Sequence, residues 1–166
     1  MWHSVVKKWR LIDIQMPTPY VRSLEGLETG IKEAIAAGRA PNTVYIVHTA
    51  LENPNVYTYY YTDPEKDVDL DFCREHNILV VRTKRGGGPA YWADSSLLAC
   101  GSAFRVDDIP DFPQTLPEIY RVVITKLSEK LNKAFGLNTF YRPLNDLEAA
   151  PGKKLSGYTG VFERGT

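Results

Sequence analysis

Residues 82–88 have the sequence Arg-Thr-Lys-Arg-Gly-Gly-Gly, and this stretch bears most directly on the fold. It continues the aliphatic run 78–82, which predicts a short buried strand that leads straight into a glycine loop. Consecutive glycines permit positive φ angles and a close approach of the backbone to a ligand. The backbone N–H groups of such a loop, with Arg82 and Lys84 beside them, can line an anion site. The alternative is a tight turn with a solvated basic shoulder; a Walker loop is excluded, because no Gly-Lys-Ser/Thr follows.

Strands and helices are predicted on both sides of this loop from the spacing of apolar residues. Leu24, Leu27, Ile31 and Ile35 recur at helical spacing, and Gly38 is placed to end that helix. Helices are expected at 21–38, 67–76 and 116–135, and strands at 9–14, 43–48, 56–62, 78–82, 91–104, 139–144 and from 155 to 162. This order predicts an α+β fold, with a mixed, largely antiparallel sheet and a few packed helices.

Length and composition limit the classes of protein that the chain can belong to. The 166 residues fit one domain, 1–166, and because they stop directly after a predicted strand we expect that domain to be incomplete at its C-terminus. Lys plus Arg and Asp plus Glu both number 20, so the net charge of zero argues against a general nucleic-acid binder. No stretch approaches the ~20 apolar residues of a membrane-spanning helix. We therefore expect neither a nucleic-acid nor a membrane partner. Because the two cysteines do not make a disulfide framework, we expect a reduced, cytoplasmic setting.

Two further segments carry residues suited to chemistry. Residues 152–157, Gly-Lys-Lys-Leu-Ser-Gly, place Lys154 beside glycines, where its charge can neutralise a negative charge that develops during a reaction. The alternative is a polar hairpin turn with two exposed lysines. Asn145-Asp146 joins an amide to a carboxylate, a combination that suits Mg²⁺ with substrate phosphates. The alternative for this dipeptide is an ordinary Asx turn.

The cysteines, histidines and tyrosines favour structural roles. The two cysteines show no CxxC or Cys/His spacing, so neither a zinc site nor a disulfide framework is expected. Cys100 could be a nucleophile, but no histidine lies near it in sequence, which favours a buried packing residue. The tyrosine-rich segment 57–61 is interpreted as an edge strand rather than as the lining of a ligand tunnel.

These segments occur in the order found in lipoate-protein ligases, which the sequence resembles over nearly its whole length. The resemblance rests on Trp-Arg-Leu-Ile at 9–12, on 68–75 followed by 80–82 and the glycine loop, on Asn-Asp-Leu at 145–147, and on Lys-Lys-Leu-Ser-Gly at 153–157. It implies the biotin/lipoate ligase catalytic-domain fold. It also implies ATP-dependent adenylation of lipoate or octanoate, followed by transfer of the acyl group to a lysine of a lipoyl-acceptor protein domain.

The resemblance also implies the role of each motif. Lys154 would be the catalytic residue, binding the acyl carbonyl and the α-phosphate, and Asp146, with Asn145, would hold Mg²⁺ or the nucleotide. The residues implied to bind nucleotide or the lipoyl group are Arg82, Lys84, Gly86, Gly87, Gly88, Asn145, Asp146, Ser156 and Gly157.

The glycine loop departs from the family pattern and leaves two alternatives open. Arg85 stands where the family has a small hydroxyl residue, Pro89-Ala90 replaces Ala-Val, and Trp92-Ala93 replaces His-Asp. One alternative is a non-catalytic binding or assembly subunit that keeps the fold, with a second chain supplying the missing strands. The other, ranked lower, is an octanoyltransferase that uses Cys100.

Overall fold

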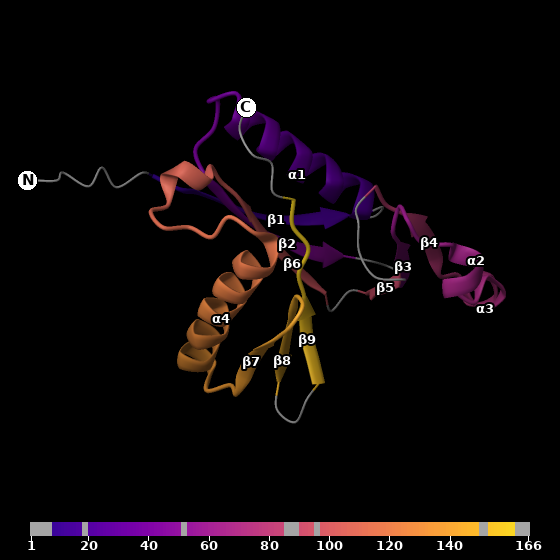
Figure 1. Ribbon diagram of the computed structural model, residues 1–166. Helices are drawn as coiled ribbons and strands as arrows, with labels where there is room; N and C mark the ends of the chain where they lie inside the picture. Colours follow the sequence, from indigo (N-terminus) through magenta and orange to yellow (C-terminus); the bar gives the residue numbers. More distant parts are fainter. Residues whose placement is uncertain are drawn as a thin grey trace, which may run out of the picture. The chain divides into compact units, whose positions relative to one another are not determined.

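The computed structural model describes residues 8–17, 20–50, 53–84, 90–94, 97–149 and 153–161 (Figure 1). The chain forms two compact units, Met1–Asp108 (unit 1) and Ile109–Thr166 (unit 2). In the described residues, unit 1 holds two three-stranded sheets and unit 2 holds one. Two of the strand pairs are parallel and the other four are antiparallel. The predicted α+β class is confirmed, with small and mostly antiparallel sheets in place of one larger sheet.

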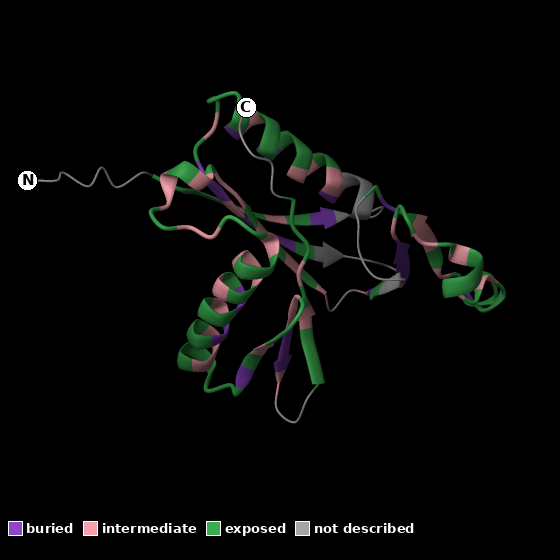
Figure 2. Cartoon of the chain, viewed as in Figure 1, coloured by how far each residue is buried: buried purple, intermediate pink, exposed green. Residues whose placement is uncertain are grey.

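The first sheet of unit 1 has the strand order β1-β2-β6 and carries most of the core. Its strands are β1 (Arg10–Pro17), parallel to β2 (Thr43–Ala50), which is antiparallel to β6 (Leu98–Ala103). Leu24, Ile31 and Ile35 of α1 (Tyr20–Ala36) are buried together with Tyr45 and Val47 of β2 (Figure 2). The apolar helix positions predicted from their spacing are therefore the ones that pack on the sheet.

The end of α1 has a local cause in the sequence. Gly38 has a φ of 69°, in the left-handed region that glycine adopts without steric cost. Its N–H donates to the carbonyl of Ile35 at 3.0 Å, and the N–H of Arg39 donates to that of Ala34 at 2.8 Å. These two bonds make the Schellman arrangement that satisfies the last carbonyls of a helix.

Gly101 of β6 faces Tyr45 of β2 across the sheet, and we expect Gly101→Ala to destabilise unit 1. A Cβ at Gly101 would lie 2.1 Å from the Tyr45 hydroxyl oxygen, which itself donates to the Glu28 carboxylate at 2.5 Å. Because the Tyr45 ring is buried and held by that bond, the overpacking should cost about 1–3 kcal/mol of unfolding free energy. Thermal or urea unfolding measures the change.

The control for Gly101→Ala is Gly30→Ala in α1. Nothing lies within 4 Å of a Cβ at Gly30. Alanine is favoured over glycine by about 0.5–1 kcal/mol inside a helix, so this variant should be slightly stabilised. Equal effects of the two substitutions would contradict the contact between Tyr45 and Gly101.

The second sheet of unit 1 differs from the sequence prediction in three respects. Its order is β4-β3-β5, so the tyrosine-bearing β3 (Asn55–Thr58) is the buried central strand and the prediction of an edge strand was wrong. β3 ends early because Thr62 Oγ1 donates to the Tyr59 carbonyl at 2.8 Å and accepts from the Tyr59 N–H at 2.9 Å, closing a turn. The edge strands are instead β4 (Leu79–Arg82) and β5 (Ala90–Ala93). β4 was predicted to be buried but has exposed and half-buried side chains.

The predicted helix 67–76 is two short helices, α2 (Pro64–Asp67) and α3 (Leu70–Glu75). Val68 is extended, with φ of −136° and ψ of 133°, and therefore ends α2. Asp69 then caps α3 by accepting the N–H of Phe72 at 2.9 Å, which starts a new helix in the middle of the predicted one. The 3₁₀ turn Val106–Asp108 closes unit 1.

Unit 2 consists of α4 (Leu116–Phe135) and an antiparallel sheet of β7 (Thr139–Arg142), β8 (Asp146–Ala149) and β9 (Lys153–Gly157). The bounds of α4 match the prediction, and Gly136 ends the helix with a φ of 64°. Asn132 of α4 joins helix to sheet, because its side chain bonds the N–H, carbonyl and hydroxyl of Thr139 at 2.8–2.9 Å. Among the described residues, no helix is long and apolar enough to cross a membrane.

Candidate functional site

The two faces of the unit 2 sheet differ in character. Thr139 faces α4, since its hydroxyl lies 3.0 Å from that of Ser128. Leu147 shares this face because it lies two residues from Ala149, the partner of Thr139, and it is only 1% exposed. Asp146 and Glu148 consequently point to the opposite face of the sheet.

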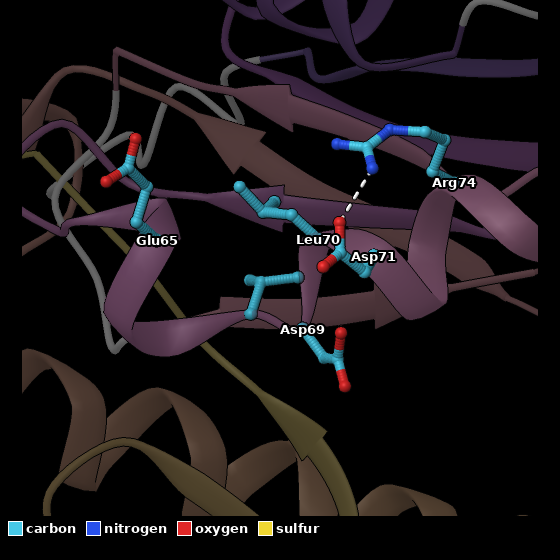
Figure 3. Close-up of a pocket in the computed structure, with 6 residues that line it drawn as sticks. Glu65, Asp69, Leu70, Asp71 and Arg74 are labelled. Carbon is cyan, nitrogen blue, oxygen red and sulfur yellow. Dashed lines mark hydrogen bonds and ion pairs between the residues drawn. The ribbon is translucent and has the colours of Figure 1, made fainter.

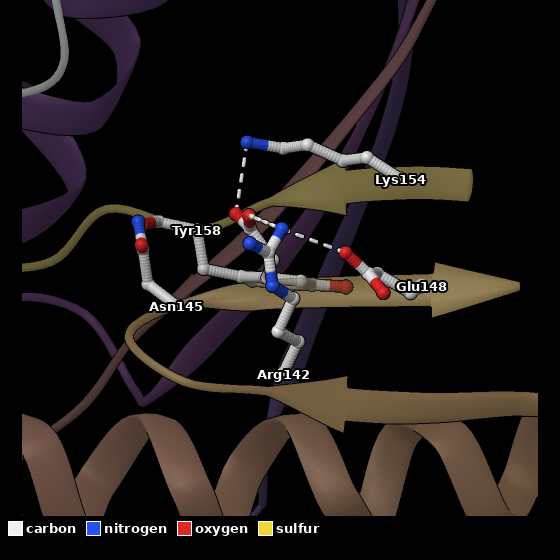
Figure 4. A network of polar contacts seen from close by, with 6 residues as sticks. Arg142, Asn145, Glu148, Lys154 and Tyr158 are labelled. Carbon is white, nitrogen blue, oxygen red and sulfur yellow. Dashed lines mark hydrogen bonds and ion pairs between the residues drawn. The ribbon is translucent and has the colours of Figure 1, made fainter. Parts of the chain in front are cut away.

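Charged side chains from all three strands meet on that opposite face (Figure 4). Lys154 Nζ lies 2.8 Å from Asp146 Oδ1, and Arg142 Nη1 lies 2.8 Å from Glu148 Oε1. Arg142 Nη1 is also 3.9 Å from Asp146 Oδ2, so the guanidinium lies between the two carboxylates. We call these four residues, Arg142, Asp146, Glu148 and Lys154, the charge network.

A β-bulge puts Lys154 in the charge network. The β8–β9 register pairs Asp146 with Gly157 and Glu148 with Lys154, and it leaves Leu155 without a partner. In a regular strand, residues three apart point to opposite faces, so Lys154 and Gly157 would be separated. The extra residue in the bulge brings both onto the face of Asp146.

Gly157 provides the space in which the Lys154 side chain lies. A Cβ at Gly157 would be 2.9 Å from Lys154 Nζ and 3.6 Å from Asp146 Oδ1. The end of a lysine side chain is flexible, so a side chain at this position would displace the ammonium from Asp146 at little cost in stability. Glycine at 157 is therefore required by the position of Lys154 more than by the backbone.

The other predicted residues of unit 2 hold the structure around this face. The Asn145 side chain donates to the carbonyl of Tyr158, and the Tyr158 N–H donates to the Asn145 carbonyl at 2.9 Å, which closes the end of the β8–β9 pair. Ser156 is the partner of Leu147 and so belongs to the α4 face. The structure thus brings Asp146, Lys154 and Gly157 together and leaves Ser156 on the other side.

Arg142 and Glu148 were missed by the sequence reasoning. Residues 146–149, Asp-Leu-Glu-Ala, alternate polar and apolar residues as a half-buried strand does, and this was the available signal. The segment was instead interpreted from Asn145-Asp146 alone, as a metal-binding dipeptide or an Asx turn. The turn before β8 lies at 143–145, and Asp146 is the first residue of β8.

In unit 1, Arg82 and Lys84 precede the predicted glycine loop, while Gly86, Gly87 and Gly88 lie outside the described residues. The Arg82 guanidinium donates to the carbonyl of Tyr60 at 2.6 Å, which fixes the turn after β3. The Lys84 backbone N–H donates to the Glu25 carboxylate of α1 at 3.2 Å. Between them, the Thr83 N–H extends the β3–β4 pairing by bonding the Thr58 carbonyl at 2.8 Å. Residues 82–84 are therefore held by hydrogen bonds to β3, to the turn after it and to α1.

Cys100 is exposed, and the prediction that it is buried was wrong. It alternates along β6 with Gly101, whose side faces Tyr45 and the core, so the thiol points the other way. Neighbouring groups still desolvate the thiol and raise the pKa of Cys100 above its usual value. A raised pKa lowers the fraction of thiolate, the nucleophilic form, at neutral pH. Burial has the same direction of effect on Tyr57, raising its pKa to about 12.

The α2–α3 segment has an open hollow of about 360 Å³, lined by Glu65, Asp69, Asp71 and Arg74 among others (Figure 3). Two of its carboxylates have structural tasks: Asp69 caps α3, and Asp71 pairs with Arg74 at 2.6 Å. Among the described residues, no group of three or more His, Cys, Asp or Glu side chains is placed to hold a metal ion. Mg²⁺ is usually held by one or two carboxylates together with water and substrate phosphates, and Asp146 supplies one such carboxylate.

Comparison with solved structures shows which fold these units belong to. Lipoate-protein ligase A bound with ATP has a TM-score of 0.71 at 19% identity, covering 95% of this chain and 62% of that chain. The bi-partite lipoate protein ligase of Thermoplasma acidophilum, described with its E2 lipoyl domain, has a TM-score of 0.69 at 20% identity, covering 95% and 58%. P. falciparum LipL1 in complex with lipoate has a TM-score of 0.65 at 13% identity, covering 94% and 45%. The chain therefore has the fold of the lipoate-protein ligases, over 45–62% of the length of these relatives.

The family model of the lipoyl protein ligase A/B catalytic domain matches residues 27–166. A search of the curated proteins finds no match. The protein belongs to the lipoyl protein ligase A/B catalytic domain family, as the order of its sequence motifs predicted.

Proposed function

We propose that this chain activates lipoate or a medium-chain acyl acid with ATP and transfers the acyl group to a lysine of a lipoyl-acceptor domain. The observation that carries the proposal is the position of Lys154, which a β-bulge and Gly157 place beside Asp146 on one face of the unit 2 sheet. The family match and the ligase fold support it. Relatives of this fold are described with bound ATP and with lipoate.

The reaction proceeds in two steps. A carboxylate oxygen of the acid attacks the α-phosphorus of ATP, and the bond to the leaving pyrophosphate breaks. The amine of the acceptor lysine then attacks the acyl carbonyl carbon, loses a proton, and AMP leaves. Negative charge collects on the α-phosphate in the first step and on the carbonyl oxygen in the second, and a fixed ammonium near both oxygens stabilises it. Lys154 is the described residue that we assign to this task.

We assign the remaining predicted residues as follows. Asp146 is the group that would hold Mg²⁺, which would neutralise phosphate charge when bound with the nucleotide. Asn145 holds the ends of β8 and β9 together through its bond to Tyr158, and Gly157 leaves space for the Lys154 side chain. Arg82, Lys84 and the glycines at 86–88 form the second predicted binding element, for the phosphates and the acyl chain. Ser156 belongs to the lysine motif, and its side chain lies on the α4 face of β9.

Acid-dependent exchange between ATP and labelled pyrophosphate tests the first step. We expect exchange that requires octanoate or lipoate and is lost when the acid is left out. Transfer is tested separately, by the mass increase of a lipoyl domain incubated with ATP and octanoate. Absence of exchange in a protein that also fails to bind ATP would contradict the proposal.

A second candidate is an assembly subunit that keeps the fold and acts only with a second chain. The observation in its favour is that the chain covers 58% of the matched chain of a ligase described as bi-partite. It predicts ATP binding without exchange, and a change of the species seen in light scattering when the complementing chain is added. Exchange by the purified chain alone would exclude this candidate.

A further inference from the structure

The charge network alternates in sign and differs in exposure. The carboxylates are the less exposed members, with 18% of the Asp146 side chain and 9% of the Glu148 side chain accessible. The cations are the more exposed members, at 56% for Lys154 and 58% for Arg142. A ligand approaching this face therefore meets two cations first, and each is already paired with a carboxylate.

This arrangement penalises a simple anion. A phosphate that binds Lys154 competes with Asp146, whose oxygen lies 2.8 Å from the ammonium. Because about half of the Lys154 side chain is accessible, breaking this pair costs less than breaking a buried one, but it leaves the less exposed Asp146 carboxylate without its nearest cation. A divalent cation alone is also disfavoured, because the positive charges of Lys154 and Arg142 repel it as it approaches Asp146.

A ligand that carries both charges meets neither penalty. Its cation can bind Asp146 while its anionic oxygens pair with Lys154 and Arg142. No charge of the network is then left without a partner. Glu148 stays on Arg142 at 2.8 Å and keeps the guanidinium between β7 and β8 during the exchange. Arg142 thereby becomes a second cation for the phosphates, beside the lysine.

We propose that Arg142, Asp146 and Lys154 form one site that accepts a polyphosphate only together with its divalent cation, with Asp146 blocking Lys154 until that cation arrives. This inference rests on the proposed function, since it deepens the assignment of Lys154 and Asp146 to nucleotide binding. It adds Arg142 as a binding residue. It also assigns to the ion pair of Asp146 and Lys154 the selection of cation-bound polyphosphate over free polyphosphate.

Calorimetric titration of the whole chain with pyrophosphate, in excess Mg²⁺ and in EDTA, tests the proposal. The unchanged protein should bind at least about tenfold more tightly with Mg²⁺, the effect of one charge-assisted bond. Asp146→Asn should bind more tightly than the unchanged protein in EDTA, by several-fold, and should lose most of the Mg²⁺ enhancement. Arg142→Gln should weaken binding in both conditions by about tenfold.

A second variant gives the mirror result and does not depend on the folding of Asp146→Asn. Lys154→Met removes the partner of Asp146, so Mn²⁺ alone, followed by electron paramagnetic resonance, should bind several-fold more tightly than to the unchanged protein. The matched controls are Lys153→Gln, one residue away and paired with Ala149, and Glu129→Gln at an exposed position of α4. Both variants should bind pyrophosphate as the unchanged protein does.

The outcomes separate this inference from the proposed function. Equal pyrophosphate affinity with and without Mg²⁺, or weaker binding of Asp146→Asn in EDTA, overturns the selective role of Asp146 and leaves the phosphate site in place. No pyrophosphate binding in either condition overturns both.

Discussion

Lys154→Met should lower acid-dependent ATP–pyrophosphate exchange by about 10²–10³-fold, the loss expected when one fixed group that stabilises transition-state charge is removed. Methionine keeps the length and most of the volume of the lysine side chain and deletes only its charge. Lys154 is exposed and lies at the edge of the unit 2 sheet, so the variant should unfold at nearly the same temperature as the unchanged protein. Exchange rates at saturating acid measure the effect on the chemical step.

Lys153→Met is the matched control, because Lys153 is the adjacent exposed lysine and pairs with Ala149 instead of Glu148. A surface substitution away from the chemistry changes free energies by about 0.5 kcal/mol or less, so exchange should stay within about twofold to threefold. Comparable losses in the two variants would show that general positive charge, and not the position set by the bulge, is what matters.

Leu147→Ala should cost about 2–5 kcal/mol of stability in unit 2, the range for truncating a buried leucine. Leu147 is 1% exposed and lies on the α4 face of β8, between the two carboxylates of the charge network. Leu155→Ala is the control, since Leu155 is 53% exposed and is the unpaired residue of the bulge. Its truncation should cost less than about 1 kcal/mol, because little apolar surface leaves a packed environment.

The measurement must report on unit 2. All three tryptophans, at positions 2, 9 and 92, belong to unit 1, so their fluorescence follows the wrong part of the chain. Hydrogen exchange of peptides covering 139–149 follows β7 and β8 directly, with peptides from α1 as the internal reference. Faster exchange in α1 alone would contradict the assignment of Leu147 to the core of unit 2.

The helices were predictable because their signal is local. In α1 and α4 the apolar residues recur every three or four positions, and a glycine with positive φ follows each helix. The helix predicted at 67–76 failed for an equally local reason: Val68 is extended and Asp69 caps the next helix, so a good apolar period was interrupted by capping. Both outcomes depend on backbone hydrogen bonds within a few residues.

The strands were harder because their partners are distant in sequence. β8 has only four residues, and its identity as a central strand depends on pairing with both β7 and β9. Lys154 and Asp146 were each predicted as site residues, but their ion pair depends on a register shift that composition does not reveal. Arg142 and Glu148 follow from that same register. The roles predicted for Gly86, Gly87 and Gly88 remain predictions.

The unpaired Leu155 makes the segment 154–157 sensitive to its length and tolerant of its composition. Since that residue takes no part in the ladder and its side chain is half exposed, many residue types can occupy the position. Its presence, however, decides on which face of the sheet the lysine side chain lies. One residue more or fewer between Lys154 and Gly157 moves that side chain to the opposite face. When relatives of this chain are aligned, a gap inside this segment therefore changes the charges on this face of the sheet, even where all the neighbouring residues are identical.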